Sequence, residues 1–549
     1  MAHAHQHRRG LLGAAAVLAL VLAGCADTSD TDGGDGSTDG ATGDGGGGGS
    51  ITVGTTDVIF SLDPAGSYDN GSFLVQNQVF PFLLNTPYGS PDVEPDIAES
   101  ADFTAPTEYT VTLKEGLTFA NGNELTSSDV KFSFDRQLAI ADPNGPSSLL
   151  YNLDSVETPD DLTVVFHLKS ENDQTFPQVL SSPVGPIVDE DVFSATELTP
   201  ADAIVEGQGF AGQYTITDYT QNELVRYEAF ADYGGMLGAA ETEVITAQYF
   251  TEETSLKLAV QQGDVDVAFR SLSPTDLADL EGDDAVTVHH GPGGEIRYIV
   301  FNFDTQPFGA QTPEADEAKA LAVRQAAAHL LDREALSQEI YQGTYTPLYS
   351  YVPEGLSGAA EPLLEMYGDG AGGPDADAAA AVLEDAGVET PVALNLQYSP
   401  DHYGNSSDEE YAMIEAQLEA SGLFDVSLQS TLWDTYNAER VEGAYPAYQL
   451  GWFPDYSDAD NYLSPFFLIE NFLVNGYVDQ EVNDLILDQA TEPDAATREE
   501  KIAEVQRLVA EDLSTLPYLQ GAQVAVAQND ITGVTLDASF KFRYAPLSR

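Results

Sequence analysis

The fold class is decided by residues 375–430, which read DADAAAAVLEDAGVETPVALNLQYSPDHYGNSSDEEYAMIEAQLEASGLFDVSLQS. Asp375–Ala386 and Glu409–Ala420 carry apolar residues at helical spacing, and a glycine follows each segment as a helix terminator. Val392–Gln397 and Val426–Ser430 have the composition and alternation of strands. This alternation of helices and strands predicts an α/β arrangement.

The same pattern extends outward, and it predicts one α/β lobe around Tyr298–Ala490. Within it, the apolar spacing of Val323–Gln342 predicts a single long helix. Thr497–Leu513 and the shorter Leu256–Gln262 also have helical spacing. The tail, Pro517–Phe542, returns to strand-like sequence.

The N-terminal half of the chain favours strands. Ile51–Val58, Tyr109–Leu113 and Leu162–Leu168 alternate apolar and polar residues. Glu94–Glu99 and Gly116–Leu125 are rich in turn-forming residues, which predicts connectors. The chain as a whole is therefore expected to be a mixed α and β protein.

Composition limits the classes of function. The chain has 549 residues, and 91 Asp and Glu against 20 Lys and Arg give it a formal net charge of −71, so contacts to nucleic-acid phosphates are not expected. A single cysteine excludes an internal disulfide framework. Apolar residues make up 42% of the chain, which argues against disorder as the reason for the acidity. A folded chain of this length is expected to form two or more lobes.

Residues 1–24 predict a signal peptide. Arg8 and Arg9 precede Leu11–Gly24, an uncharged run that is too short to cross a membrane as a stable helix. The small residues before Cys25 resemble the lipobox of bacterial lipoproteins, in which the cysteine becomes the lipidated N-terminus of the mature chain. An ordinary signal peptide with a chance cysteine is the alternative. The paired arginines leave both the general secretory and the twin-arginine routes open.

Residues 25–50 predict a flexible tether behind the lipidated Cys25. Ala26–Ser50 is rich in glycine and aspartate and has no apolar residue larger than alanine, so it cannot bury a core. Its root-mean-square span as a random coil is about 25–30 Å. We therefore expect a folded body anchored to the outer face of the cell membrane.

A search for catalytic, metal-binding and cofactor-binding patterns finds no specific signal. The five histidines beyond the signal peptide lack both the HExxH spacing and a cysteine partner for zinc; they are His167, His289, His290, His329 and His402. There is no G-x-S-x-G nucleophile motif and no twelve-residue calcium loop. The sequence therefore predicts neither catalytic residues, nor a metal, nor a cofactor.

Six segments, in order between Ser61 and Asp458, resemble the large extracytoplasmic solute-binding proteins of peptide/nickel-type ABC importers (family 5). The resemblance covers nearly the whole mature chain. The segments are Ser61–Pro64 with Tyr68-Asp69, Glu94–Ser100, Tyr109–Phe132, Leu258–Asp266, Asn302–Arg333 and Gly451–Asp458.

This resemblance implies a fold of two α/β lobes, as in type II periplasmic binding proteins of the large cluster with an extra subdomain in the first lobe. The implied first lobe is 51–295, with the extra subdomain at about 86–185. The implied second lobe is 296–515, and 516–549 return to the first lobe. Such lobes close on the solute by hinge motion.

The implied function is that of a solute-binding lipoprotein, monomeric and without enzymatic activity, which delivers peptides or a related cationic or zwitterionic solute to an ABC permease and its ATPase. The alternatives are a cell-surface hydrolase acting on peptides or glycans, which would need a nucleophile or a metal site, and an acidic surface-layer or adhesion protein.

The resemblance also implies a binding site in the segment Gly451–Asp458. Asp455 matches the family aspartate that accepts the α-ammonium group of the ligand, and Trp452 and Tyr456 lie beside it. A carboxylate in a partly desolvated cleft makes a charge-assisted hydrogen bond that is about twice as strong as a neutral one. A solvated acid in an acidic protein is the alternative for Asp455.

The resemblance implies five further binding-site residues, each from its position in the matched segments. Arg440 matches an arginine that contacts the far end of the peptide, and a salt bridge to a neighbouring glutamate is its alternative role. Trp433 matches a tryptophan that lines a side-chain pocket, and core packing is its alternative role. The remaining three match a segment that pairs with the peptide backbone: Tyr68, Asp69 and Asn70.

The chain departs from oligopeptide binders at the carboxylate end of the ligand. Gln449 stands where those proteins carry a second arginine, and the match drifts near Tyr398–His402. The resemblance therefore supports a contact to the ammonium end of the ligand but not to its carboxylate end. This leaves the identity and length of the solute open.

Overall fold

The computed structural model describes residues 49–549, apart from Ser271 and Asn405. The predicted signal peptide, the lipidated Cys25 and all but the last two residues of the predicted tether lie outside the described residues.

Within the described part of the chain, eleven strands form the main sheet. Their order is β15-β14-β16-β12-β17-β11-β1-β10-β9-β8, and β13 pairs separately with β17. The strands are β1 (Ser50–Thr55), β8 (Tyr214–Thr220), β9 (Leu224–Ala229), β10 (Val244–Tyr249), β11 (Val267–Phe269), β12 (Val286–Phe301), β13 (Tyr345–Pro347), β14 (Val392–Tyr398), β15 (Phe424–Ser430), β16 (Ala447–Trp452) and β17 (Thr515–Gln528).

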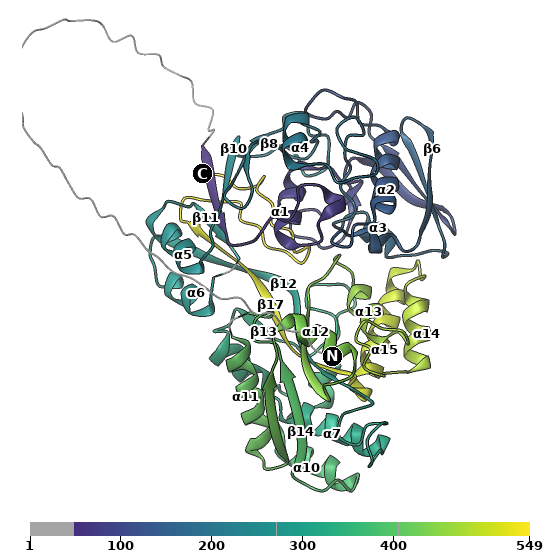
Figure 1. The fold of residues 1–549 in the computed structure, drawn as a ribbon, viewed down its shortest axis with the longest axis vertical. Coiled ribbons are helices and arrows are strands. Elements are labelled where there is room, and N and C mark those ends of the chain that lie inside the picture. Colours follow the sequence, from purple (N-terminus) through teal and green to yellow (C-terminus); the bar gives the residue numbers. More distant parts are fainter. Residues whose placement is uncertain (1–48, 271, 405) are drawn as a thin grey trace, which may run out of the picture. The chain divides into compact units, whose positions relative to one another are not determined.

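The strands β12 and β17 join the two halves of this sheet (Figure 1). They pair antiparallel from Val286 opposite Gln528 to Val300 opposite Thr515. The register shifts between Pro292 and Ile296, so the ladder is interrupted there. Gly293 is required at this crossing, because a Cβ atom on it would meet the carbonyl oxygen of Gly521 at 1.7 Å.

A four-stranded antiparallel sheet lies apart from the main sheet, in the order β4-β5-β7-β6. Its strands are β4 (Ala98–Ala105), β5 (Glu108–Leu113), β6 (Leu153–Asp160) and β7 (Thr163–Leu168). The helix α2 (Ser127–Ile140) packs against it and begins with a capping box formed by Thr126 and Asp129. A short hairpin of β2 (Leu84–Asn85) and β3 (Glu94–Pro95) precedes this sheet.

Besides α2, the α-helices of the described residues are α1 (Asn70–Val79), α3 (Phe176–Val179), α4 (Ala201–Gly207), α5 (Glu253–Gln262), α6 (Pro274–Glu281), α7 (Glu317–Leu330), α8 (Arg333–Ala335), α9 (Pro362–Met366), α10 (Ala376–Asp385), α11 (Ser407–Ala420), α12 (Trp433–Val441), α13 (Ser464–Phe467), α14 (Gln480–Gln489) and α15 (Ala495–Asp512). They pack on the sheets or on one another; for example, α11 packs on β15, and α10 packs on α7 (Figure 1).

Three large hydrophobic cores hold these elements. Core 1 gathers β1, α1, β8–β11 and apolar residues of the tail up to Leu547. Core 2 lies between the four-stranded sheet, α2 and α3. Core 3 is formed by the second half of β12, β14–β16 and most of the later helices.

The predicted helices and strands at residues 375–430 are confirmed as α10, β14, α11 and β15. The prediction of one helix over Val323–Gln342 was wrong. The helix α7 ends at Leu330, and the Asp332 carboxylate accepts a hydrogen bond from the Ala335 backbone N–H at 2.9 Å, which starts α8. An aspartate that caps a new helix competes with continuation of the old one.

Two other expectations also need correction. Glu94–Glu99 is not only a connector, because β3 and the start of β4 lie in it. The strand in the tail ends at Gln528, and residues up to Phe542 do not continue it. Phe542 is buried by stacking on Phe269, with ring centroids 4.1 Å apart, so its apolar character reflects packing and not strand pairing.

Candidate ligand-binding site

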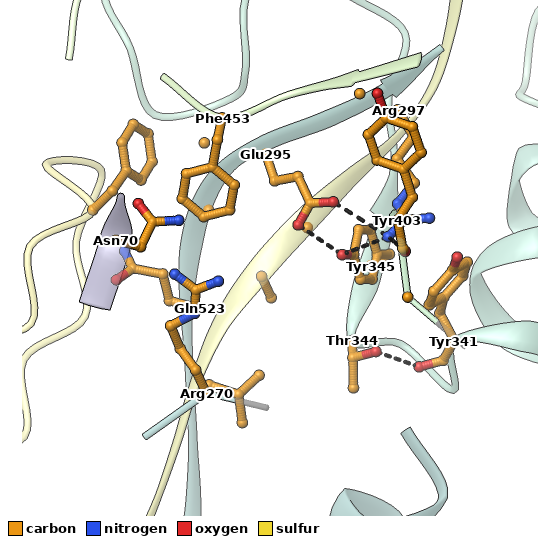
Figure 2. Close-up of a pocket in the computed structure, with 18 of the residues that line it drawn as sticks. Asn70, Arg270, Glu295, Arg297, Tyr341, Thr344, Tyr345, Tyr403, Phe453 and Gln523 are labelled. Atoms are coloured by element: carbon orange, nitrogen blue, oxygen red, sulfur yellow. Dashed lines mark hydrogen bonds and ion pairs between the residues drawn. The ribbon is translucent and has the colours of Figure 1, made fainter. Parts of the chain in front are cut away.

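A cavity of about 880 Å³ lies between residues of core 1, core 3 and the crossing strands. Its volume is in the range of small-molecule binding sites. Tyr68 and Asn70 reach it from the start of α1, and Glu295 and Arg297 reach it from β12. Figure 2 shows the cavity and several of its lining residues. The lining also includes Glu253, Phe269, Arg270, Tyr341, Tyr345, His402, Tyr403, Trp433, Trp452, Phe453, Asp455, Phe472, Gln523 and Phe540.

Asp455 lies in this lining, in the loop after β16, and is partly buried. The Tyr68 hydroxyl donates a hydrogen bond to its Oδ1 atom, and Asn461 Nδ2 donates to its Oδ2 atom at 3.1 Å. Burial raises the pKa of Asp455, while the two hydrogen bonds act in the opposite direction. Asp455 can therefore accept a cationic group, and the Tyr68 hydroxyl already contacts one of its two oxygens.

Asn461, a residue that the sequence analysis did not identify, organises this loop. Its Oδ1 atom accepts hydrogen bonds from Trp452 Nε1 at 3.0 Å and from the Asp455 backbone N–H at 2.9 Å. Asp458 caps the short 3₁₀ helix that carries Asn461 (Ala459–Tyr462), and Arg498 holds the Asp458 carboxylate at 2.7 and 2.8 Å. One buried amide thus fixes both the indole and the carboxylate predicted for the site.

Both tryptophans contribute to the cavity lining. The Trp433 ring stacks on the His402 ring, with centroids 3.6 Å apart and planes within 3° of parallel. Trp452 packs edge to face against Phe466 at 5.1 Å. The cavity is thus walled by rigid aromatic rings, which favour amphipathic ligands.

Three of the residues predicted for the site lie away from this lining. Arg440 is 2% exposed; its Nε atom donates to Asn437 Oδ1 at 2.8 Å, and its guanidinium lies 4.6 Å from the centre of the Phe472 ring. Asp69 caps α1 by accepting a hydrogen bond from the Ser72 backbone N–H at 2.8 Å. Tyr456 packs against core 2 and borders a smaller cavity of about 40 Å³.

An arginine-centred network, which the sequence analysis missed, lines the other side of the cavity (Figure 2). Arg297 is 4% exposed, and its guanidinium lies 3.1 Å from Glu410 Oε2 and 3.3 Å from Glu295 Oε1. Tyr345 accepts a hydrogen bond from Arg297 at 3.1 Å and donates one to Glu295 at 2.7 Å. The available signal was a charged residue inside the otherwise apolar run Ile296–Phe301.

Comparisons with known proteins identify the family and the fold. Residues 92–472 match the family model described as bacterial extracellular solute-binding proteins, family 5 middle. This chain belongs to that family. The predicted fold class is also confirmed, because periplasmic binding proteins share the described α/β fold.

The relatives differ in what their names say they bind. The dipeptide-binding protein of Escherichia coli (strain K12) is 24% identical over 426 residues, which cover 73% of this chain and 74% of the relative. Heme-binding protein A of Haemophilus influenzae is 27% identical over 418 residues, covering 71% of each chain. The structure of HbpA2 from Haemophilus parasuis superposes with a TM-score of 0.77 at 22% identity and covers 91% of this chain and 99% of its own. The first two relatives are named as binding proteins and not as enzymes.

The described residues contain neither a membrane-spanning helix nor a cluster of metal-ligating side chains. Over residues 49–549 without 271 and 405, no helix is both long and apolar enough to cross a membrane. In the same part of the chain, no three His, Cys, Asp or Glu side chains are grouped so that they could hold a metal ion.

Proposed function

We propose that this family 5 solute-binding protein captures short peptides in the 880 Å³ cavity and delivers them to an ABC permease and its ATPase. The observation that carries the proposal is Asp455, a partly buried carboxylate in an aromatic cavity, with a neutral hydroxyl as its partner across the cavity. The similarity to the dipeptide-binding protein of Escherichia coli supports the peptide assignment.

The chemistry of Asp455 explains why an ammonium group would bind there. The Tyr68 hydroxyl satisfies one carboxylate oxygen, and an arriving ammonium replaces a neutral donor by a charged one. A charge-assisted hydrogen bond contributes about 1.5–3 kcal/mol, against about 1 kcal/mol for a neutral one. A ligand that displaces the hydroxyl without supplying a positive charge would leave the carboxylate poorly compensated.

The same proposal assigns roles to the cores and the chain ends. Core 1 and core 2 would form the first lobe, residues 51–295, and core 3 the second, residues 296–515, with 516–549 returning to the first. The lobes would move about β12 and β17, where the ladder is interrupted. Cys25 would anchor the monomer to the membrane by its lipid, and the protein would perform no covalent chemistry.

Thermal unfolding with a pool of di- to tetrapeptides tests the proposal. Ligand binding to the folded state alone raises the melting temperature by mass action. N-acetylation of the peptides should weaken binding about 10-fold to 100-fold, which corresponds to the loss of one charge-assisted contact. Asp455→Asn should weaken binding of the unmodified peptides by a similar factor.

Asp385→Asn is the matched control, because Asp385 is exposed at the end of α10 and away from the cavity lining. It should leave peptide binding unchanged. If no peptide in the pool shifts the melting temperature of the wild-type protein, the peptide assignment is wrong. Release of products from peptide or glycan substrates by the purified protein would instead favour a hydrolase.

A further inference from the structure

Arg270 offers the cavity a second charged group, of opposite sign to Asp455. It follows directly after β11, and it lines the cavity with 31% of its side chain exposed. Its guanidinium lies 5.0 Å from the centre of the Phe453 ring, which holds the planar group in place (Figure 2).

The charge of Arg270 is only weakly compensated by the protein. Among the described residues, the one carboxylate within ion-pair distance is Asp57, whose Oδ1 atom lies 3.9 Å from Arg270 Nε. Charge-assisted hydrogen bonds of this kind are about 2.7–2.9 Å long. The other guanidinium in the lining differs, since Arg297 is bound by Glu295, Glu410 and Tyr345. Arg270 therefore keeps its fork available for a ligand.

The backbone around Arg270 is held in an unusual conformation next to an unpaired acceptor. Arg270 has φ +62°, in the left-handed region that side-chain-bearing residues seldom adopt, and such strain is concentrated at binding sites. Its backbone N–H donates to the Val524 carbonyl oxygen at 3.2 Å. The neighbouring Gln523 has a buried Oε1 atom with no hydrogen-bond partner among the described residues.

We propose that Arg270 binds a carboxylate of the ligand, so that this protein selects compact zwitterions whose ammonium group binds Asp455. The inference rests on the proposed function at Asp455. Phe453, on whose ring the Arg270 guanidinium packs, is two residues before Asp455, so one short loop after β16 contacts Arg270 and carries Asp455 in the same cavity lining. Arg270 would thus supply, from a different segment of the chain, the contact to the ligand carboxylate that Gln449 does not provide.

Isothermal titration with matched ligands tests this inference. The probes are a pool of dipeptides with free carboxylates and the same pool with amidated C-termini. The wild-type protein should bind the free acids at least 10-fold more tightly than the amides. Arg270→Gln should lose that preference, and Arg270→Lys should keep part of it, because lysine retains the charge without the planar fork.

Two variants separate the role of Arg270 from general effects of charge. Asp57→Asn removes the weak ion pair and should leave the preference for free acids intact. Arg226→Gln removes an exposed positive charge on β9 and should have no effect on binding. If Arg270→Gln retains the preference, or if the wild-type protein binds acids and amides equally, the inference is wrong and the proposed function at Asp455 still stands.

The same titration is run with N-acetyl amino acids and their amides, which lack an ammonium group. If dipeptides fail to bind but these acids bind in an Arg270-dependent way, the peptide assignment fails and the carboxylate site stands. If no carboxylate ligand of either kind depends on Arg270, the carboxylate site is refuted.

Discussion

Replacing Asn461 by alanine should destabilise the binding loop by an amount that the structure allows us to estimate. The change leaves the Trp452 indole N–H and the Asp455 backbone N–H without their common acceptor. A buried unpaired donor costs about 1–3 kcal/mol. Asn461 is 2% exposed, but Trp452 and Asp455 are only partly buried, so water can replace part of the loss. We expect the free energy of unfolding to fall by about 2–3 kcal/mol.

Asn461→Asp gives a sharper test, because it keeps the Oδ1 acceptor and changes only the donor. The new carboxylate would lie near Asp455 Oδ2, where the amide nitrogen now lies at 3.1 Å. Two carboxylates at this distance share a proton, which raises the apparent pKa of the pair. Protonation then stabilises the folded state at low pH, and this stability is lost as the pH rises through the raised pKa.

The assay is denaturant unfolding of the ligand-free protein at pH 5 and pH 8. Asn461→Asp should be close to the wild type at pH 5 and clearly less stable at pH 8. Asn144→Asp adds an acid at an exposed position and serves as the control. The reasoning is refuted if Asn461→Ala is as stable as the wild type, or if the deficit of Asn461→Asp is the same at both pH values.

Two further changes are predicted. Burial raises the pKa of Asp460 from 3.8 to about 6, so ionisation of Asp460 destabilises the folded protein as the pH rises from 4 to 7. Asp460→Asn keeps the acceptor for Gln489, and between pH 4 and pH 7 its free energy of unfolding should rise by on the order of 3 kcal/mol relative to that of the wild type. Denaturant unfolding measures this difference, and a difference that does not change with pH would contradict the prediction. Gly293→Ala should lower the melting temperature strongly and disrupt the strand crossing, because the new Cβ atom would meet the backbone of Gly521. Gly282→Ala is the control and should be tolerated, because the atom nearest to its new Cβ is 3.5 Å away. Equal melting temperatures for the two variants would contradict the crossing geometry.

Local sequence signals predicted much of the fold. The apolar alternation of Tyr109–Leu113 corresponds to β5, because a strand buried on one face needs that pattern. The same reasoning failed at Asp332, where a capping side chain ends one helix and starts another within an apolar pattern that continues. It failed also at Phe542, because burial against a core produces apolar residues in irregular chain as well as in strands.

The candidate site was predictable only where a local motif carries it. Asp455 and Trp452 stand together in one short segment that resembles a known family, and both line the cavity. Arg270, Arg297 and Asn461 could not be found in this way. Their roles depend on which distant residues neutralise or orient them, as with Glu410, which is more than a hundred residues from Arg297. Such pairings are fixed by tertiary structure and leave no mark on local spacing.

The path of β17 has a consequence for how the chain folds. Near its C-terminal end, Ala525 and Ala527 belong to core 1, together with Phe542 and Tyr544 from the tail. The same core contains β1, which comes first in the described chain, so core 1 joins residues from both ends of it. A nascent chain therefore cannot complete its first core until almost all of it has been made. Contacts of such long sequence separation form slowly. Core 1 must therefore stay incomplete until the C-terminal residues arrive, whereas the buried residues of core 2 all lie between positions 83 and 211 and can pack before the chain is finished.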